Sequence, residues 1–252
     1  MKIDFSGKHA LVTGGSMGIG RAIAEELSKA NAKVTTVSRS DSDAIPNANH
    51  AHLQTDFSKP DEALSMLGEY ISKNPVDILI NNTGGPKPGN IVDADWNDFT
   101  GALEMHLKMS HGLVQLVLPS MKERNFGRII NVISTSVKMP IAGLGVSNTT
   151  RGAMANWSKT LSFELGQYGI TVNNILPGFI ATTRLDAIIE AKSKSQNMSP
   201  EAVSDQLKSW VPAGRFGLPE EMAHVAVFLA SEQAAYVNGT NIQIDGGRTA
   251  AL

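Results

Sequence analysis

The sequence predicts a doubly wound α/β fold, with a parallel sheet of about seven strands and helices on both faces. Short β-branched segments alternate with longer helical segments, which is the pattern of successive βαβ units. Several strand segments are apolar almost throughout, as strands are when helices cover both faces of a sheet. A glycine-rich turn joins the first strand segment to the first helical segment. A length of 252 residues suits one domain of this kind, spanning 1–252.

The predicted elements follow one another in the order that βαβ units require. Apolar strand segments lie at 9–14, 33–39, 50–56, 77–83, 127–134, 170–178 and 240–247. Helical patterns lie at 18–30, 60–73, 95–124, 149–167 and 219–231.

One polar segment, 183–215, interrupts this alternation. Ser199, followed by Pro200 and Glu201, is typical of a helix N-terminus, so the segment is expected to form two short helices. It follows the sixth strand, at the edge where open α/β sheets bind their ligands. This location favours a lid over a substrate pocket, and a solvated excursion is the alternative.

Charge and composition exclude several classes of function. A formal net charge of −2, from 22 basic and 24 acidic residues, gives no electrostatic case for nucleic acid or an anionic membrane surface as a partner. The absence of cysteine excludes disulfides and a cysteine nucleophile. No signal peptide and no apolar segment of about 18 residues is present, so we expect a cytoplasmic protein. The histidines are not paired with carboxylates at metal-ligand spacing, and we expect no metal site.

The segment TGGSMGIG at 13–20 directly follows the first strand and opens the first helix. Its glycines permit a tight turn, close approach of the backbone to a pyrophosphate, and close packing of helix on strand. The helix N-terminus offers unpaired N–H groups and the positive end of its dipole to phosphates. This context predicts a Rossmann-type nicotinamide dinucleotide site. The residues expected to bind the cofactor in this turn are Gly14, Ser16, Gly18, Ile19 and Gly20.

The end of the second strand bears on the choice between NADP(H) and NAD(H). NAD(H) sites commonly place an acidic residue there, whereas this chain has Ser38 and then Arg39. A hydroxyl and a guanidinium suit a 2′-phosphate, so NADP(H) is favoured over NAD(H). A solvated surface charge is the alternative interpretation of Arg39. Asp56, which closes the third strand, is placed to accept a hydrogen bond from the adenine amino group.

Further motifs follow in order: NNTG at 81–84, Ser134, the pair Pro177-Gly178, and PAGRFGLPE at 212–220. With these motifs, the chain resembles the short-chain dehydrogenase/reductase family over essentially its whole length, and within it the 3-oxoacyl-acyl-carrier-protein reductase branch. The resemblance implies a Rossmann fold, a small-molecule substrate and a homotetramer or homodimer. It also implies that NNTG partly stabilises the central sheet. The further cofactor-lining residues that it implies are Asn82, Gly84, Pro177, Gly178, Ile180 and Thr182.

The family's catalytic set is Asn, Ser, Tyr and Lys, and this chain keeps one of the four. The resemblance places the serine at Ser134, and the tyrosine and lysine positions are then Ser147 and Arg151. The asparagine position is occupied by His106. No Tyr-x-x-x-Lys occurs anywhere in the sequence.

These replacements change the available proton chemistry. A serine hydroxyl is a much weaker acid than a phenol, whose pKa is about 10, and Ser147 is also too short to take its place. Arg151 stays protonated at working pH, although it can bind the cofactor ribose or a substrate carboxylate. His106 titrates near neutrality, and Arg151 would lower its pKa. We consider His106 a partial replacement for the lost acid, with a space-filling helix histidine as the alternative.

Three functions remain open from the sequence. The first is an NADP(H)-dependent oxidoreductase acting on a carbonyl or hydroxyl compound with altered proton transfer. The second is a catalytically silent cofactor-binding sensor or scaffold, which the replacements at 106, 147 and 151 favour. The third is a non-redox isomerase or dehydratase that uses His106 or Ser134. The intact cofactor turn, nicotinamide-side residues and lid favour the first.

Overall fold

The computed structural model describes residues 3–43, 45 and 49–251, and it contains one parallel sheet. The seven strands have the order β3-β2-β1-β4-β5-β6-β7, so the direction of winding reverses between β1 and β4. This confirms the predicted doubly wound sheet and places a ligand-binding crevice at the carboxyl ends of β1 and β4. The ends of the proposed 1–252 domain, residues 1–2 and 252, lie outside the described part. The strands are β1 (His9–Thr13), β2 (Lys33–Ser38), β3 (His50–Gln54), β4 (Ile78–Asn81), β5 (Gly127–Val132), β6 (Ile170–Pro177) and β7 (Asn241–Ile244).

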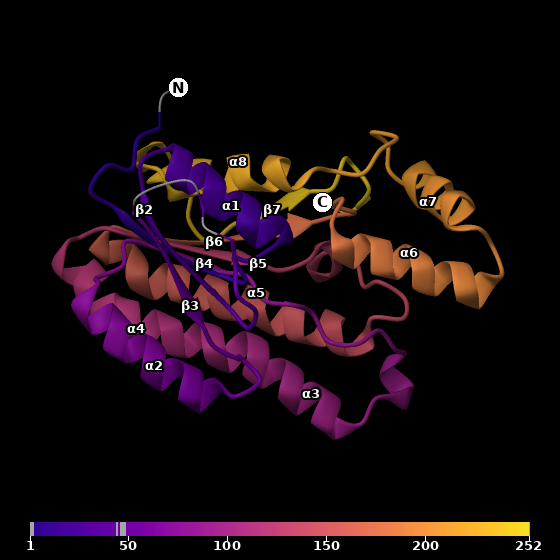
Figure 1. Cartoon of the computed structure of the whole chain (residues 1–252), viewed down its shortest axis with the longest axis horizontal. Coiled ribbons are helices and arrows are strands. Elements are labelled where there is room, and N and C mark those ends of the chain that lie inside the picture. Colours follow the sequence, from indigo (N-terminus) through magenta and orange to yellow (C-terminus); the bar gives the residue numbers. More distant parts are fainter. Residues whose placement is uncertain (1–2, 44, 46–48, 252) are drawn as a thin grey trace.

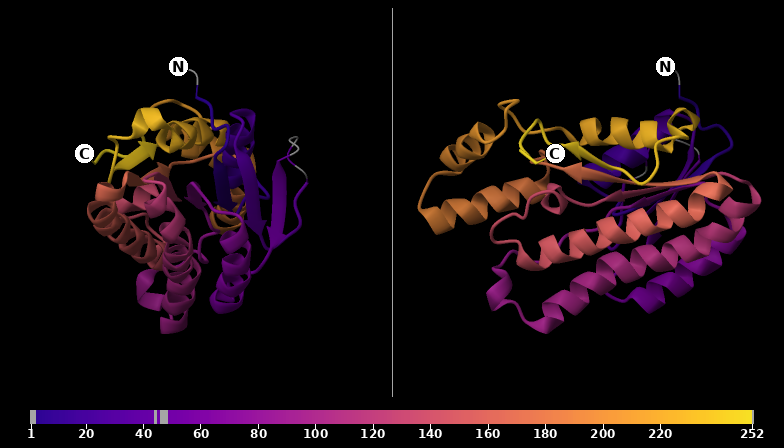
Figure 2. Two further views of the ribbon diagram at one scale, coloured as in Figure 1. Left: turned by 90° about the vertical axis from the view of Figure 1, so that its left-hand side faces the viewer. Right: turned by 180° about the vertical axis from the view of Figure 1, so that it is seen from behind.

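Helices cover both faces of the sheet (Figure 1; Figure 2). On one face α1 (Gly18–Lys29) packs against α8 (Pro219–Ala230). The other face carries α2 (Pro60–Lys73), α4 (Met109–Glu123) and α5 (Gly145–Leu165). Within the described residues, no helix combines the length and apolarity needed to span a membrane.

Each strand contributes side chains to two cores, because successive residues of a strand point to opposite faces. Val12 and Ile80 pack on the α1 and α8 side, whereas Leu11 and Leu79 pack on the α2 and α4 side. All four side chains are completely buried. Burial on both faces explains why the central strands are apolar throughout.

A row of hydrogen-bonded asparagine side chains, called here the asparagine ladder, runs across the four strands β4, β5, β6 and β7. Asn81 Nδ2 donates to Asn131 Oδ1 at 2.8 Å, and Asn131 Nδ2 donates to Asn174 Oδ1 at 3.0 Å. Asn174 Nδ2 then donates to Asn241 Oδ1 at 2.8 Å. Because these residues are in register on four adjacent strands, the ladder ties β4, β5, β6 and β7 together.

The predicted helix at 95–124 is interrupted. The chain forms α3 (Trp96–Leu103), one π-helical turn, η2 (Glu104–Lys108), and then α4. A π turn inserts one extra residue into a helix and commonly occurs at functional sites, and His106 is at the centre of this one. A second difference concerns α5, which begins at Gly145, four residues before the predicted start. A Cβ at Gly145 would overlap Ile91, so this position has no room for a side chain.

The polar segment 183–215 forms two helices, as predicted: α6 (Thr183–Gln196) and α7 (Pro200–Ser209). Ser199 Oγ accepts a hydrogen bond from the Ala202 N–H at 3.2 Å, which confirms the N-cap. Both helices extend beyond the carboxyl ends of the strands (Figure 1). They bury a small apolar cluster of their own, separate from the two main cores, around Leu185, Val203 and Leu207.

Candidate active site

The glycines of the turn between β1 and α1 are required either by the backbone conformation or by lack of space for a Cβ. Gly14 and Gly18 have φ values of +59° and +56°, in the left-handed region that favours glycine. A Cβ on Gly20 would overlap the carbonyl oxygen of Gly14. A Cβ on Gly15 would lie 2.7 Å from Thr36 Cγ2, so Gly15 is a fourth obligatory glycine that the sequence analysis did not single out.

The N-terminus of α1 is open to a ligand. Its N-cap residue, Met17, provides no side-chain hydrogen bond, and no acidic residue lies in the first turn. Ser16 and Ile19, on either side, are half-buried. Uncapped N–H groups beside a glycine-lined turn fit the pyrophosphate of a dinucleotide, since they supply both donors and positive potential.

Asn82 connects this turn to β4. Its Nδ2 lies 3.3 Å from Thr13 O and 3.2 Å from Gly14 O, and donates to both carbonyls. The Asn82 side chain is therefore committed to holding the turn. Gly84, two residues later, is exposed, and a Cβ added to it would meet no atom within 4 Å. This open space lies where the cofactor is expected to pass.

Ser38, Arg39 and Asp56 lie at or just after the carboxyl ends of β2 and β3, where the sequence predicts the adenosine end of the cofactor. Ser38 Oγ donates its proton to Ser40 O at 2.6 Å, so that proton is not available to a phosphate. The exposed Arg39 is then the group that can bind a 2′-phosphate. Hydrogen bonds from Ser58, and next the charge of Arg39, lower the pKa of Asp56, which places the carboxylate near the guanidinium.

The segment after β6 leads from the sheet to the glycine turn. Gly178 N donates to Ile244 O at 3.0 Å, which holds Pro177 and Gly178 against β7. Ile180 is buried, and Thr182 Oγ1 donates to Ile180 O at 3.3 Å. A Cβ on Gly18 would lie 3.4 Å from Thr182 Cγ2, so Thr182 stands directly across the cofactor turn.

The two serines of the candidate catalytic set lie on adjoining elements. Ser134 follows β5, and its Oγ accepts a hydrogen bond from Ser136 N at 3.0 Å. That bond leaves the Ser134 hydroxyl proton free to be donated. Ser147 is buried in the first turn of α5, which packs against the turn at Thr135–Val137 that Ser134 caps.

Arg151, one turn further along α5, is 7% exposed and has only neutral partners. Its Nη1 donates to Val132 O at 3.3 Å, and its Nη2 to Thr83 O at 3.5 Å. Among the described residues, it forms no ion pair with a carboxylate. Burial, and next the charge of Arg184, lower its pKa to about 10, so Arg151 is cationic at neutral pH.

His106 is almost completely buried in η2. Its Nδ1 shares a hydrogen bond with Thr83 Oγ1, and its Nε2 has no partner among the described residues. Burial, then Arg151, then Arg184 lower the pKa of His106 to about 3. The expected effect of Arg151 is confirmed, but burial is the larger cause. His106 also borders a cavity of about 420 Å³ between the 86–90 loop and α3.

Sequence reasoning missed Arg184, the second residue of α6. Its Nη2 would lie 2.7 Å from a Cβ on Gly85, so the guanidinium packs on the backbone of the segment that follows β4. Its charge lowers the pKa of both Arg151 and His106. In the sequence, Arg184 is marked only as a cation two residues after Thr182. Its place at the site could be predicted only with knowledge of the path of α6.

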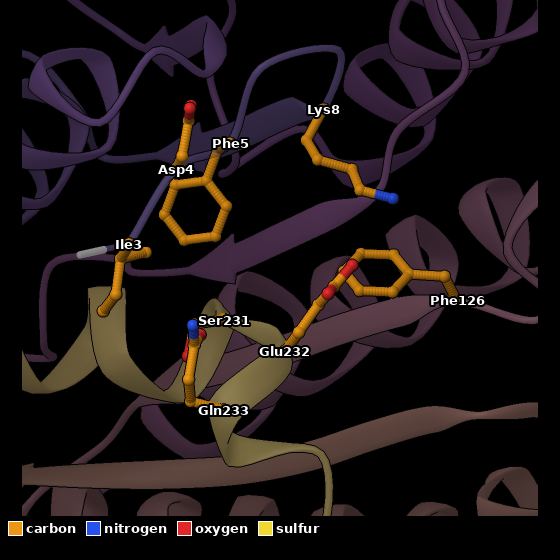
Figure 3. A pocket seen from close by; sticks show the side chains of 8 residues that line it. All are labelled: Ile3, Asp4, Phe5, Lys8, Phe126, Ser231, Glu232 and Gln233. Atoms are coloured by element: carbon orange, nitrogen blue, oxygen red, sulfur yellow. The ribbon is translucent and has the colours of Figure 1, made fainter. Parts of the chain in front are cut away.

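A second cavity, of about 50 Å³, lies at the amino-terminal edge of the sheet. Figure 3 shows it between the residues before β1, including Phe5 and Lys8, and Phe126, which precedes β5. Lys8 Nζ lies 3.9 Å from the centroid of the Phe126 ring. The cavity is much too small for a dinucleotide. No group of three or more potential metal ligands occurs in the described part of the chain.

The comparisons with known proteins identify the family. A family model described as Enoyl-(Acyl carrier protein) reductase matches residues 14–249. The 3-oxoacyl-(acyl-carrier-protein) reductase FabG of Escherichia coli (strain K12) is 34% identical over 97% of this chain and 98% of its own length. The chain belongs to the short-chain dehydrogenase/reductase family. This confirms the resemblance and the enzyme class, an oxidoreductase.

Other similar members of the short-chain dehydrogenase/reductase family are described as NADPH-dependent. BacG of Bacillus subtilis (strain 168), named an NADPH-dependent reductase, is 32% identical over 96% of this chain and 98% of its own length. The crystal structure of YwfH, an NADPH-dependent reductase, has a TM-score of 0.90 at 31% identity, covering 97% and 99% of the two chains. L-sorbose reductase from Gluconobacter frateurii, in complex with NADPH and L-sorbose, has a TM-score of 0.92 at 29% identity and full coverage of both chains.

Proposed function

We propose that this chain is an NADP(H)-dependent oxidoreductase of a small carbonyl or hydroxyl compound in which charge stabilisation replaces the family's tyrosine acid. The observation that carries the proposal is Arg151. It is a buried cation without a carboxylate partner among the described residues, at the position that corresponds to the family's lysine. Its Nη2 donates to Thr83 O, and the neighbouring Asn82 holds the glycine turn that fits a dinucleotide. A charge left unneutralised in this way costs free energy unless a ligand compensates it.

NADP(H) is the cofactor that the residues and the relatives both support. Arg39 is exposed at the end of β2, where a 2′-phosphate would lie, and no acidic residue occupies that strand end. Gly14, Gly18 and Gly20 would hold the pyrophosphate on the N-terminus of α1. When bound, the cofactor supplies or accepts the hydride.

The residues at the nicotinamide end would act on the charge of the substrate oxygen. During reduction of a carbonyl, negative charge develops on this oxygen, and the Arg151 cation and the Ser134 hydroxyl would stabilise it. Such a donor typically contributes ~10²–10³ in rate, against ~10²–10⁴ for a positioned general acid. The alkoxide would take its proton from water, since neither Ser147 nor Arg151 can release one readily.

His106 is better suited to positioning than to acid catalysis. With a pKa of about 3, it lies four units below pH 7, so about one molecule in 10⁴ would carry the imidazolium. Its hydrogen bond to Thr83 Oγ1 instead orients the segment whose carbonyl receives Arg151 Nη2. We therefore propose that His106 holds Thr83 and Arg151 in place.

The lid, the oligomeric state and the location complete the proposal. Segment 183–215 lies at the carboxyl ends of the strands and brings Arg184 to the site, which supports a lid function.

The exposed aromatic side chains Phe163 and Tyr236 support a homotetramer or homodimer, because such surfaces are commonly buried in assemblies. Light scattering would test the assembly. A cytoplasmic location stays a prediction from the sequence.

A catalytically silent sensor is the second candidate. It is favoured by the simultaneous replacement at 106, 147 and 151 and by the burial of His106 away from solvent. The isomerase or dehydratase alternative has weaker support, because Ser134 has no base partner among its described contacts.

The decisive experiment uses NADPH deuterated at the transferable position with a panel of ketones and 3-oxoacyl thioesters. We expect deuterium in at least one product, together with loss of nicotinamide absorbance. Binding of NADPH without label transfer to any compound would support the sensor. Conversion of a substrate without consumption of NADPH would support the non-redox enzyme.

A further inference from the structure

Two arginines from different helices meet at the substrate end of the cofactor cleft. Arg151 comes from the core helix α5, and Arg184 comes from the first turn of the lid helix α6. Arg184 lies on Gly85 and Arg151 reaches the carbonyl of Thr83, so both contact the same short segment after β4. They are close enough to act electrostatically on each other and on His106.

No acidic group of the described residues neutralises this pair. Three other arginines of the described residues have carboxylate partners: Arg215 Nη2 lies 2.7 Å from Glu221 Oε1, Arg21 Nε lies 2.6 Å from Glu25 Oε1, and Arg124 Nε lies 3.1 Å from Asp77 Oδ1. The buried Arg128, like Arg151, donates to main-chain carbonyls. Arg151 donates only to two main-chain carbonyls, and no ion pair of Arg184 occurs among residues 3–43, 45 and 49–251. Two adjacent cations without a counter-charge are an arrangement that an anion stabilises.

One buried polar atom on a residue that responds to the charge of this pair also lacks a hydrogen-bond partner in the described part of the chain. His106 Nε2 is buried and unpartnered among the described residues, and the neutral imidazole adds no charge that would compensate the arginines. Gly85 has no side chain, which allows the Arg184 guanidinium to approach the backbone. The site therefore combines two guanidinium groups with a close approach of Arg184 to the backbone at Gly85.

We propose that Arg151 and Arg184 bind a carboxylate of the substrate, so that the enzyme acts on oxo acids or hydroxy acids. Guanidinium groups match carboxylates geometrically through paired N–H donors. Because Arg184 is carried by α6, binding of the acid would draw the lid over the reacting carbon. The inference rests on the proposed function and gives its substrate class. A phosphate of the cofactor is the other possible source of an anion here, and the experiment separates the two.

The test uses the full-length protein saturated with NADPH and pairs of compounds that differ only in charge. The probes are pyruvate with methyl pyruvate, and acetoacetate with methyl acetoacetate. Oxidation of NADPH gives turnover, and nicotinamide fluorescence of the bound cofactor gives binding. The variant is Arg184→Gln. Its matched control is Lys194→Gln, which removes an exposed charge from the same helix, away from the site.

We expect the acids to be preferred over their esters by about tenfold or more in kcat/KM, and Arg184→Gln to remove this preference. The variant should change the Kd of NADPH by less than about threefold, and Lys194→Gln should change neither quantity. Equal use of acids and esters by the unaltered protein would overturn the inference. So would a loss of NADPH affinity in Arg184→Gln, because the anion would then be a cofactor phosphate.

Failure of the proposed function gives a different result. If no compound is reduced but the acids change the fluorescence of bound NADPH and Arg184→Gln abolishes that change, the carboxylate site stands and the reductase assignment is wrong. If the acids produce neither turnover nor a fluorescence change, the carboxylate site is overturned.

Discussion

The two ends of the cofactor cleft differ in how they are built. At the glycine turn, the decisive constraints are steric and involve the backbone: Gly14 has a positive φ, and a Cβ on Gly20 would overlap a carbonyl oxygen. At the nicotinamide end, the family's functional groups are side chains, and we propose that three of the four are replaced, at positions 106, 147 and 151. If this proposal holds, the fold preserves cofactor binding through backbone geometry while its chemistry changes through single side chains.

The largest expected effect would come from restoring the family's chemistry at the altered end. The double variant Ser147→Tyr with Arg151→Lys should raise turnover of neutral ketones by about 10²–10⁴, because a phenol beside a lysine is a positioned acid. Steady-state oxidation of NADPH measures this. Arg151→Lys alone is the control and should give no gain, since it supplies no phenol. A double variant that binds NADPH and shows no gain would mean that more of this end has changed than these two residues.

A methyl group at the unaltered end should abolish cofactor binding. In Gly20→Ala the new Cβ meets the carbonyl oxygen of Gly14, and we expect a loss of about 3 kcal/mol or more in the free energy of unfolding, with loss of NADPH binding. The control is Gly152→Ala in α5, where a Cβ would meet nothing within 4 Å. It should stabilise the fold by ~0.5–1 kcal/mol in urea unfolding. If Gly20→Ala and Gly152→Ala had similar free energies of unfolding and similar affinities for NADPH, the steric explanation of the glycine turn would be wrong.

The preference for NADP(H) should depend on Arg39. Arg39→Glu should weaken NADPH binding by about 10–100-fold and change NADH binding by less than about threefold, because only NADPH carries the 2′-phosphate. Fluorescence titrations with both cofactors measure this. Lys73→Glu makes the same charge change at the end of α2 and should leave both Kd values unaltered. An equal loss for both cofactors would place Arg39 on a part of the nucleotide that they share.

The smallest effect concerns acid stability. The folded pKa of His106 is about 3, below its unfolded value of 6.5, so between these values the unfolded state binds the proton more tightly and stability falls as the pH falls. At pH 5, 1.5 units below 6.5, this corresponds to about 2 kcal/mol at 1.36 kcal/mol per unit. In urea unfolding, the free energy of unfolding of His106→Asn should fall less between pH 7 and pH 5 than that of the unaltered protein. The expected difference is about 2 kcal/mol. Parallel pH profiles would show that His106 is accessible to protons in the folded state.

The sheet and its covering helices could be predicted because periodicity and apolar content report directly on burial. All seven strand segments, and both helices of 183–215, were found near their predicted places. The π turn at Glu104–Lys108 was not foreseen, since a one-residue shift in helical hydrogen bonding leaves no mark in a pattern of apolar residues. The early start of α5, at Gly145, was not foreseen either, because this glycine made the segment before 149 a poor match to a helical pattern.

The candidate site was predictable where it rests on short motifs and not where it depends on distant packing. Residues in the glycine turn and after β6 have recognisable local spacing, so Gly18 and Thr182 could both be named beforehand. Arg184 could not, because its contact with Gly85 depends on how α6 crosses the cleft. The strong burial of His106 and its bond to Thr83 likewise follow from the π turn.

The central claim is that the cofactor half of the site is intact and specific for NADP(H). The most direct measurement is a titration of the unaltered protein with NADPH and with NADH, following energy transfer from tryptophan to the bound nicotinamide. The account predicts saturable binding of NADPH that is at least about tenfold tighter than that of NADH. Absence of binding by either nucleotide, or tighter binding of NADH, would contradict it.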